Sequence, residues 1–176
     1  AYQNNHRREF DFRRGDRENN PITDLVLQTH TFDATFNRYG NNGNKRTYGI
    51  NTIVQVNSNI PGSLSNTVIP NLDSMAGGAF VMQRWMMEAF ELEAGLRYDY
   101  KVFDAAGFRY SYNTADGNPN SDIEEQYYGG KNTFHNVTGS AGFRWLISPA
   151  WQLLSNAGLA WRAPSANELY SNGLHH

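Results

Sequence analysis

Cysteine is absent from the 176-residue chain, which excludes a disulfide framework and any metal site built on thiolates. No apolar stretch approaches the ~20 residues of a transmembrane helix. Charge is balanced, with 15 Lys and Arg against 17 Asp and Glu, so the sequence predicts no nucleic-acid partner. The mean hydropathy of −0.65 excludes helical spans but not membrane β-strands, whose apolar residues are spread by alternation.

The signatures of common catalytic sites are missing as well. The chain has no GxSxG nucleophile turn, no HExxH zinc motif and no phosphate-binding Walker loop. The adjacent carboxylates Glu124 and Glu125 stand in a charged stretch, where we expect them to be solvated. We therefore predict a protein that is not an enzyme and that holds no cofactor.

Alternation is the strongest feature that is present, and it is clearest from Phe90 to Val102. Apolar and charged residues fall on opposite sides there, with the two-residue period of a β-strand. Residues 90–102 at about 3.3 Å each span roughly 43 Å, and a tilt near 45° reduces this to about 30 Å, the thickness of a hydrocarbon core. The stretch therefore predicts a membrane strand with one side toward lipid and the other, bearing five charges, toward a wet lumen: Glu91, Glu93, Arg97, Asp99 and Lys101.

Weaker alternation along the rest of the chain predicts an all-β, antiparallel meander of about seven strands. Within 24–37 the apolar residues change face near Thr31 and Phe32, which predicts a bulge there. The lipid-facing side of 24–37 and of 77–87 stays open. The isolated His6, His30 and His135 are expected to be polar strand residues. Besides 90–102, the predicted strands are 2–12, 24–37, 48–57, 77–87, 134–147 and 151–161.

The predicted connections differ in length. Those near Glu88 and Pro149 are short, whereas those at 58–75 and 104–133 are long, and 13–23 is also predicted to be a loop. Outer-membrane barrels pair short periplasmic turns with long extracellular loops, so we expect the long loops outside. Tryptophans then form two interfacial belts. Trp85, Trp145 and Trp151 lie beside the short turns, and Trp161 lies at the opposite end.

The same alternation also fits a different class of protein. With the apolar side turned inward, the strands would form a soluble antiparallel β module for binding or adhesion. Burial of Leu92, Leu96, Phe143 and Leu159 inside a closed core would favour that alternative.

Several short motifs, in this order along the chain, resemble the barrel of TonB-dependent outer-membrane receptors. They are YQNNHRREFDFRRGD at 2–16, YGINTIVQVNSN at 48–59, Ile69-Pro70-Asn71, GLRYDY at 95–100 and WRAPSANELYSNGLHH at 161–176. The resemblance implies a location in the bacterial outer membrane, contact with its lipid, and import of a scarce nutrient such as an iron-siderophore, haem or another metal complex with energy from TonB. Such receptors close a 22-stranded barrel around an N-terminal plug.

On this resemblance, residues 1–176 are a partial barrel segment that supplies about seven strands. We expect TonB to act through a plug domain that this segment lacks, and the lumen charges to pair with that plug or with neighbouring strands. The two open sheet edges of an isolated segment are expected to allow rearrangement or self-association.

The resemblance also suggests where a small-molecule or metal-chelate ligand binds. The stretch Trp161 to Pro164 resembles a box in haem receptors, and 167–176 resembles a segment of zinc-importing receptors. The same Arg-Ala-Pro turn occurs in receptors for many substrates, and the terminal His pair also fits the remnant of a purification tag. The ligand-binding candidates are Arg162, Glu168, Tyr170, Tyr127 and Tyr128, and the metal candidates are His175 and His176.

Tyr127 and Tyr128 are candidates because tyrosine joins an apolar body to a polar tip, which suits the mouth of a ligand pocket. With Tyr110 and Tyr112 they fall in the predicted loop 104–133. The alternative is that these rings only stiffen the loop.

Overall fold

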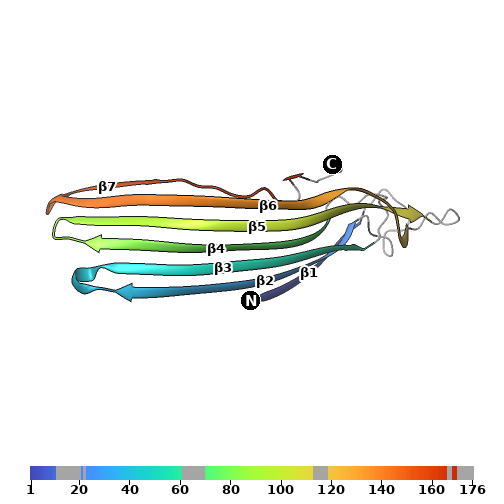
Figure 1. Cartoon of the computed structure of the whole chain (residues 1–176), viewed down its shortest axis with the longest axis horizontal. Helices are drawn as coiled ribbons and strands as arrows, with labels where there is room; N and C mark the ends of the chain where they lie inside the picture. Colours follow the sequence, from blue (N-terminus) through green and yellow to red (C-terminus); the bar gives the residue numbers. More distant parts are fainter. Residues whose placement is uncertain (11–20, 22, 61–69, 113–118, 166–167, 170–176) are drawn as a thin grey trace.

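A computed structural model describes residues 1–10, 21, 23–60, 70–112, 119–165 and 168–169, with only the main chain described for 107–112 and 119–129. It forms one antiparallel sheet in which each strand pairs with the next along the chain (Figure 1). The predicted seven-stranded meander is confirmed. The strands are β1 (Tyr2–Glu9), β2 (Thr23–Tyr39), β3 (Lys45–Ile60), β4 (Asn71–Met86), β5 (Phe90–Tyr112), β6 (Pro119–Ser148) and β7 (Trp151–Gly158).

Short connections gather at one end of the sheet, on the left in Figure 1. A 3-10 turn, η1 (Asn41–Gly43), joins β2 to β3, and residues 87–89 and 149–150 join the other two pairs. Asn42 and Gly43 have φ angles of 60° and 80°, which asparagine and glycine tolerate best. At the opposite end, called the long-loop end, β1, β3 and β5 end and β2, β4 and β6 begin.

Two of the predicted long loops are wrong in extent. Residues 104–133 form mostly strand, because β5 continues to Tyr112 and β6 begins at Pro119. The loop predicted at 58–75 shrinks to 61–70. Glycine, asparagine and aspartate are rare in strands, but continuous main-chain pairing from Phe90↔Trp145 to Gly107↔Tyr128 outweighs that preference here.

The predicted bulge at Thr31 and Phe32 is also wrong. Pairing between β2 and β3 runs without interruption from Asp24↔Ile60 to Tyr39↔Lys45. The apolar residues change face because Leu25 is buried on the charged face at the long-loop end, whereas Phe32 lies on the opposite face. The change of face along β2 therefore comes from apolar residues buried on one face at one end and exposed on the other face farther along, not from an inserted residue.

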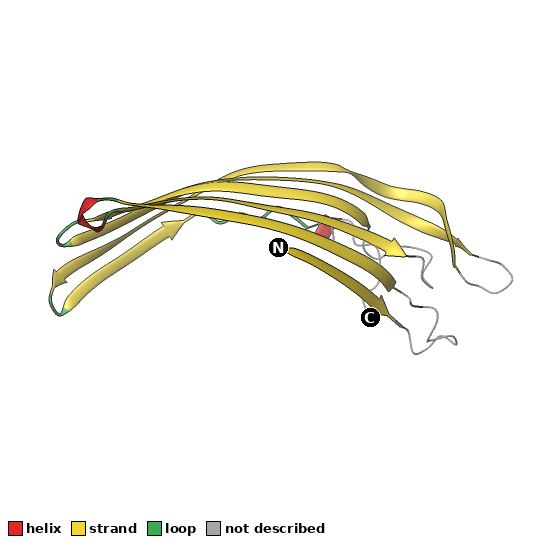
Figure 2. Cartoon of the chain, turned by 90° about the horizontal axis from the view of Figure 1, so that it is seen from below, coloured by secondary structure: helices red, strands yellow, loops and turns green. Residues whose placement is uncertain are grey.

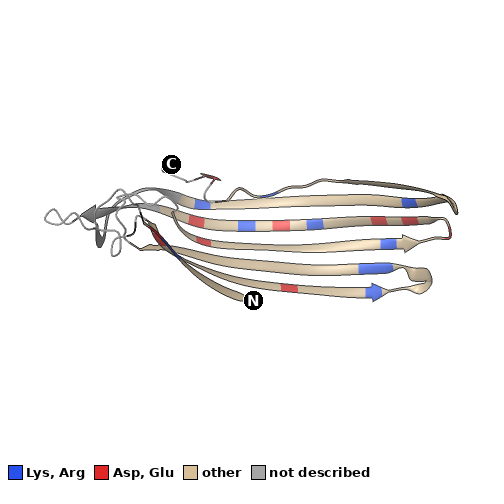
Figure 3. Cartoon of the chain, turned by 180° about the vertical axis from the view of Figure 1, so that it is seen from behind, with Lys and Arg blue, Asp and Glu red and all other residues tan. Residues whose placement is uncertain are grey.

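Register gives the middle of the sheet one charged face and one apolar face, whereas toward the two ends the apolar-face side also carries charged residues such as Asp24 and Arg46. The charges on β5 form a row of both signs (Figure 3). Cross-strand pairs share a face, so the side that the sequence left open for β2 and β4 is now assigned. The apolar face carries Phe32, Phe36, Ile50, Val54, Met75, Val81, Trp85, Phe90, Leu92, Leu96, Tyr98, Val137, Phe143, Trp145, Trp151 and Leu153.

The sheet arches but does not close (Figure 2). Leu92, Leu96, Phe143 and Leu159 are 39%, 56%, 37% and 76% exposed, so within the described residues they do not lie in a closed core. A soluble β module would bury these four side chains, so their exposure argues against that alternative. The few buried apolar side chains, Leu25, Phe103 and Pro70 among them, gather toward the long-loop end. In the part of the chain described, no helix has the length and apolarity to cross a membrane.

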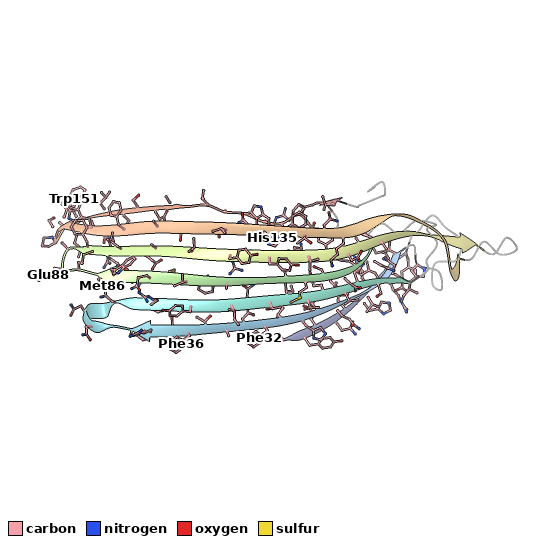
Figure 4. All side chains as sticks on the ribbon, viewed as in Figure 1. Phe32, Phe36, Met86, Glu88, His135 and Trp151 are labelled. Carbon is pink, nitrogen blue, oxygen red and sulfur yellow. The ribbon has the colours of Figure 1, made fainter. Side chains whose placement is uncertain are left out.

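Aromatic residues border the apolar face at two levels. At the short-turn end the rings of Phe90 and Trp145 stack with centroids 5.4 Å apart, and Trp151 lies at that end too (Figure 4). Farther along β5 and β6, the hydroxyl of Tyr98 lies 2.7 Å from Nδ1 of His135, and Tyr100 packs on the same ring. From Phe90 to Tyr100 the strand covers about 34 Å, which a tilt near 40° reduces to about 26 Å, close to the height of a lipid-facing band.

Candidate ligand-facing site

An ionic pair lies flat on the middle of the charged face. Arg97 Nε donates to both carboxylate oxygens of Asp99 at 2.8 Å, and Arg97 Nη2 donates to Oδ1 of Asn51 at 2.7 Å. Gly78 makes this possible, since a Cβ built there would be 2.1 Å from Arg97 Nη2. The absence of a side chain at this glycine lets a long charged side chain cross β4 without projecting from the sheet.

Replacing Gly78 with valine is expected to lift Arg97 off the sheet and to lower the free energy of unfolding by about 1 kcal/mol, the order of one partly exposed polar contact. Gly77→Val is the matched control, because a Cβ at Gly77 meets only ordinary contacts, the nearest at 3.6 Å. Denaturant unfolding of both variants in lipid vesicles measures the difference. Equal midpoints for the two variants would contradict this role of Gly78.

A second charged group lies on the same face near the short turns. Arg84 contacts Glu91 at 3.2 Å and Glu93 at 2.9 Å, and Arg144 contacts Glu91 at 3.1 Å. These four charges border a hollow of about 430 Å³. The two basic and two acidic groups balance, so these lumen charges pair with neighbouring strands, as predicted.

The segment after β7 folds into a compact ionic clasp formed by Arg162, Ser165 and Glu168. The Arg162 guanidinium donates Nη1 to Oε2 of Glu168 at 3.0 Å and Nη2 to Oε1 at 2.5 Å. The main-chain N–H of Ser165 donates to the same carboxylate at 2.7 Å, and its hydroxyl contacts Oε2 at 3.1 Å. Two parallel bonds from arginine fix both the distance and the orientation of the two planar groups.

The clasp shifts the titration of its carboxyl group. Hydrogen bonding from Arg162, followed by the bonds from Ser165, lowers the pKa of Glu168 to about 2. The same contact raises the pKa of Arg162 above its ordinary value. Both side chains are exposed, 71% for Arg162 and 46% for Glu168, so solvent screens their attraction. The clasp is therefore fully ionised at neutral pH.

Lys101 anchors the clasp segment to the sheet. Its Nζ donates to the carbonyl oxygen of Pro164 at 3.1 Å and lies 5.5 Å from the ring centroid of Phe103. Ala163, between Arg162 and Pro164, is buried at 8% exposure. Lys101 stands on the charged face, so the contact ties the segment to the side that bears the other charges.

The family comparison agrees with this geometry. The model for the β-barrel of TonB-dependent receptor-like proteins matches residues 1–176, the whole chain. The chain belongs to the TonB-dependent receptor family. This is a family of bacterial outer-membrane transport proteins rather than enzymes, and its members work with TonB. No curated protein and no solved structure matches the chain significantly. In outer-membrane barrels the apolar face meets lipid and the polar face lines the lumen, so we interpret the apolar face of this sheet as its lipid side and the charged face as its lumen side.

The structure brings together Arg162 and Glu168, the two predicted site residues whose side chains it describes. The main chain of Tyr127 and Tyr128 lies in β6, not in a loop, and their side chains are outside the described residues. Tyr170, His175 and His176 fall outside the described residues altogether. Among the residues that the structure describes, no three His, Asp or Glu side chains gather to hold a metal ion.

Sequence reasoning missed two members of this site. Ser165 stands three residues before Glu168, and Ser-x-x-Glu is the spacing in which a glutamate reaches back to a serine main-chain N–H. That spacing was a usable signal. Lys101 was predicted only as a lumen charge. Lys101 and Pro164 are 63 residues apart in the sequence, so no local sequence pattern could have predicted their contact.

Proposed function

We propose that the complete receptor containing this segment binds and imports a scarce metal complex, an iron-siderophore or haem, with energy from TonB. Family membership supports the import of a bulky nutrient across the outer membrane. The finer assignment rests on the clasp, an oriented cation held over the lumen face of a transport barrel. Residues 1–176 would then form part of the barrel wall, with the plug supplied by another region.

The clasp suits an anionic or oxygen-rich chelate. Arginine carries five N–H donors in a planar fork, and the contacts with Glu168 use Nη1 and Nη2. The remaining donors are held in a fixed orientation, which reduces the entropy lost when a ligand oxygen binds. Lys101 adds an ammonium group beside this segment.

We propose that the remaining predicted ligand-binding and metal-binding residues act at the long-loop end of the sheet. We assign Tyr127, Tyr128 and Tyr170 to the rim of the ligand site and His175 and His176 to a metal-binding position, since neutral imidazoles bind zinc and haem iron. Changing both histidines to alanine in the complete receptor is the direct test of the metal assignment. Unaltered affinity for zinc and haem would remove it.

Uptake by cells that express the complete receptor tests the transport function. Accumulation of a radiolabelled ferric chelate or of haem is expected to fall to the background of receptor-free cells when TonB is absent or the proton gradient is collapsed. Binding at the cell surface should persist under both conditions, because recognition does not consume that energy. Uptake that continues unchanged without TonB would contradict the proposal.

A further inference from the structure

A groove crosses the lipid side of the sheet above Gly139. Its lining includes Val81, Leu96 and Leu159, together with Gly139 and the residues next to Val81, Leu96 and Gly139 on β4, β5 and β6. The groove has a volume of about 230 Å³ and lies at the absent side chain of Gly139. Leu96 and Leu159 are 56% and 76% exposed, so both side chains stand open to the surroundings of the sheet.

This groove lies within the predicted hydrocarbon band. On β6, Gly139 is six residues from Trp145, which belongs to the aromatic level at the short-turn end (the inner aromatic row). It is four residues from His135, which belongs to the other level with Tyr98 and Tyr100 (the outer aromatic row). Four residues cover about 13 Å along a strand, which a tilt near 40° reduces to about 10 Å, less than the thickness of one leaflet. The groove thus begins near the middle of the band and faces one leaflet.

A polar pair lies where the groove meets the outer aromatic row. Tyr98 follows Leu96 on the same face of β5, and its hydroxyl contacts Nδ1 of the exposed His135 ring at 2.7 Å. No hydrogen bond from Nε2 to a described residue accompanies this contact. When the Tyr98 hydroxyl donates to Nδ1, the Nε2 hydrogen is left to donate to an oxygen outside the protein.

We propose that this surface is a binding site for one membrane lipid, with an acyl chain in the groove above Gly139 and a phosphate oxygen at His135. The apolar walls match a hydrocarbon chain, and the histidine N–H matches an anionic head group at the depth where head groups begin. The site faces the leaflet on the long-loop side. It lies on the opposite face from the clasp and does not depend on which nutrient the receptor imports.

The proposal predicts lipid retention that depends on both ends of the site. The intact receptor in nanodiscs made of phosphatidylglycerol and phosphatidylcholine is probed with spin-labelled phosphatidylglycerol, and the motionally restricted fraction gives the relative affinity. Gly139→Leu fills the groove and should fold, because a Cβ at Gly139 meets nothing closer than 3.5 Å. His135→Phe keeps the ring but removes its N–H donor. Each change is expected to lower relative affinity about five- to tenfold, the size of one such contact.

Matched controls separate this site from the general lipid shell. Ala94→Leu adds three carbon atoms, against four in Gly139→Leu, on the lipid side of β5 outside the groove lining, and should leave affinity unchanged. Spin-labelled diacylglycerol, which has the acyl chains but no phosphate, should bind the native receptor as weakly as phosphatidylglycerol binds the His135→Phe variant. Equal affinities for Gly139→Leu and Ala94→Leu would overturn the acyl-chain groove. Equal affinities of the two lipids for the native receptor would overturn the head-group contact.

Discussion

Replacing Leu96 with arginine is expected to lower the free energy of unfolding of the intact barrel by about 2–4 kcal/mol, the cost of a cationic side chain near the bilayer midplane on the lipid face. Leu96 stands on the apolar face between Phe90 and Tyr100, the two levels at which aromatic residues border that face. An arginine there must either leave its charge in hydrocarbon or stretch toward a distant interface.

Ser140 provides the matched control on the lumen side. It lies beside Leu96 on the neighbouring strand, since Leu96 pairs with Gly139, but it points to the charged face. Ser140→Arg places the same side chain at nearly the same depth in water and is expected to change the unfolding free energy by less than about 1 kcal/mol. Reversible denaturant titration of both variants in lipid vesicles measures the contrast.

Equal losses for the two variants would show that the apolar face does not meet lipid. If the apolar face met water instead of lipid, Leu96 at 56% exposure would tolerate arginine as well as Ser140 does. The pair of variants therefore tests the assignment of faces on which the receptor interpretation depends.

Alternation predicted the faces correctly wherever apolar and charged residues separate cleanly, as in β5. It left β4 open because Phe80 and Met82 lie on the charged face although both are apolar. The structure supplies the reason for Phe80: a Cβ at Gly49 would be 2.1 Å from the Phe80 ring, so the ring covers the glycine of the neighbouring strand. Such a contact depends on register, which the sequence of one strand does not contain.

The long hairpin of β5 and β6 marks a second limit. Residues 104–133 carry the composition of a loop, and their strand structure comes from pairing with each other rather than from local preference. The candidate site likewise has one part that local sequence patterns predict and one part that depends on long-range pairing. The motif around Arg162 and the Ser165–Glu168 spacing are local and visible in the sequence, whereas the Lys101 anchor depends on how the segment after β7 returns to β5.

Replacing Arg162 with methionine is expected to move the titration midpoint of Glu168 from about 2 up toward its ordinary value of 4.5. The hydrogen bonds from Arg162 are the largest cause of the depressed pKa, and methionine keeps an unbranched apolar stem without the guanidinium donors. Because the folded pKa of Glu168 is lowered, the clasp stabilises its segment fully above pH 4.5 and loses that contribution as the pH falls through about 2. The carboxyl carbon resonance of Glu168, followed by NMR in the refolded receptor, reports the midpoint.

Lys101→Met separates the ionic clasp from its anchor. Lys101 contacts Pro164, and the causes of the Glu168 shift are Arg162, Ser165 and desolvation, so this variant should leave the midpoint near 2 while releasing the segment from β5. If the clasp orients Arg162 for a ligand, both variants should weaken binding of the chelate, but only Arg162→Met should change the titration. A Glu168 midpoint near 2 in the Arg162→Met variant would show that the guanidinium does not hold this carboxylate and would remove the basis for an oriented cation at the lumen wall.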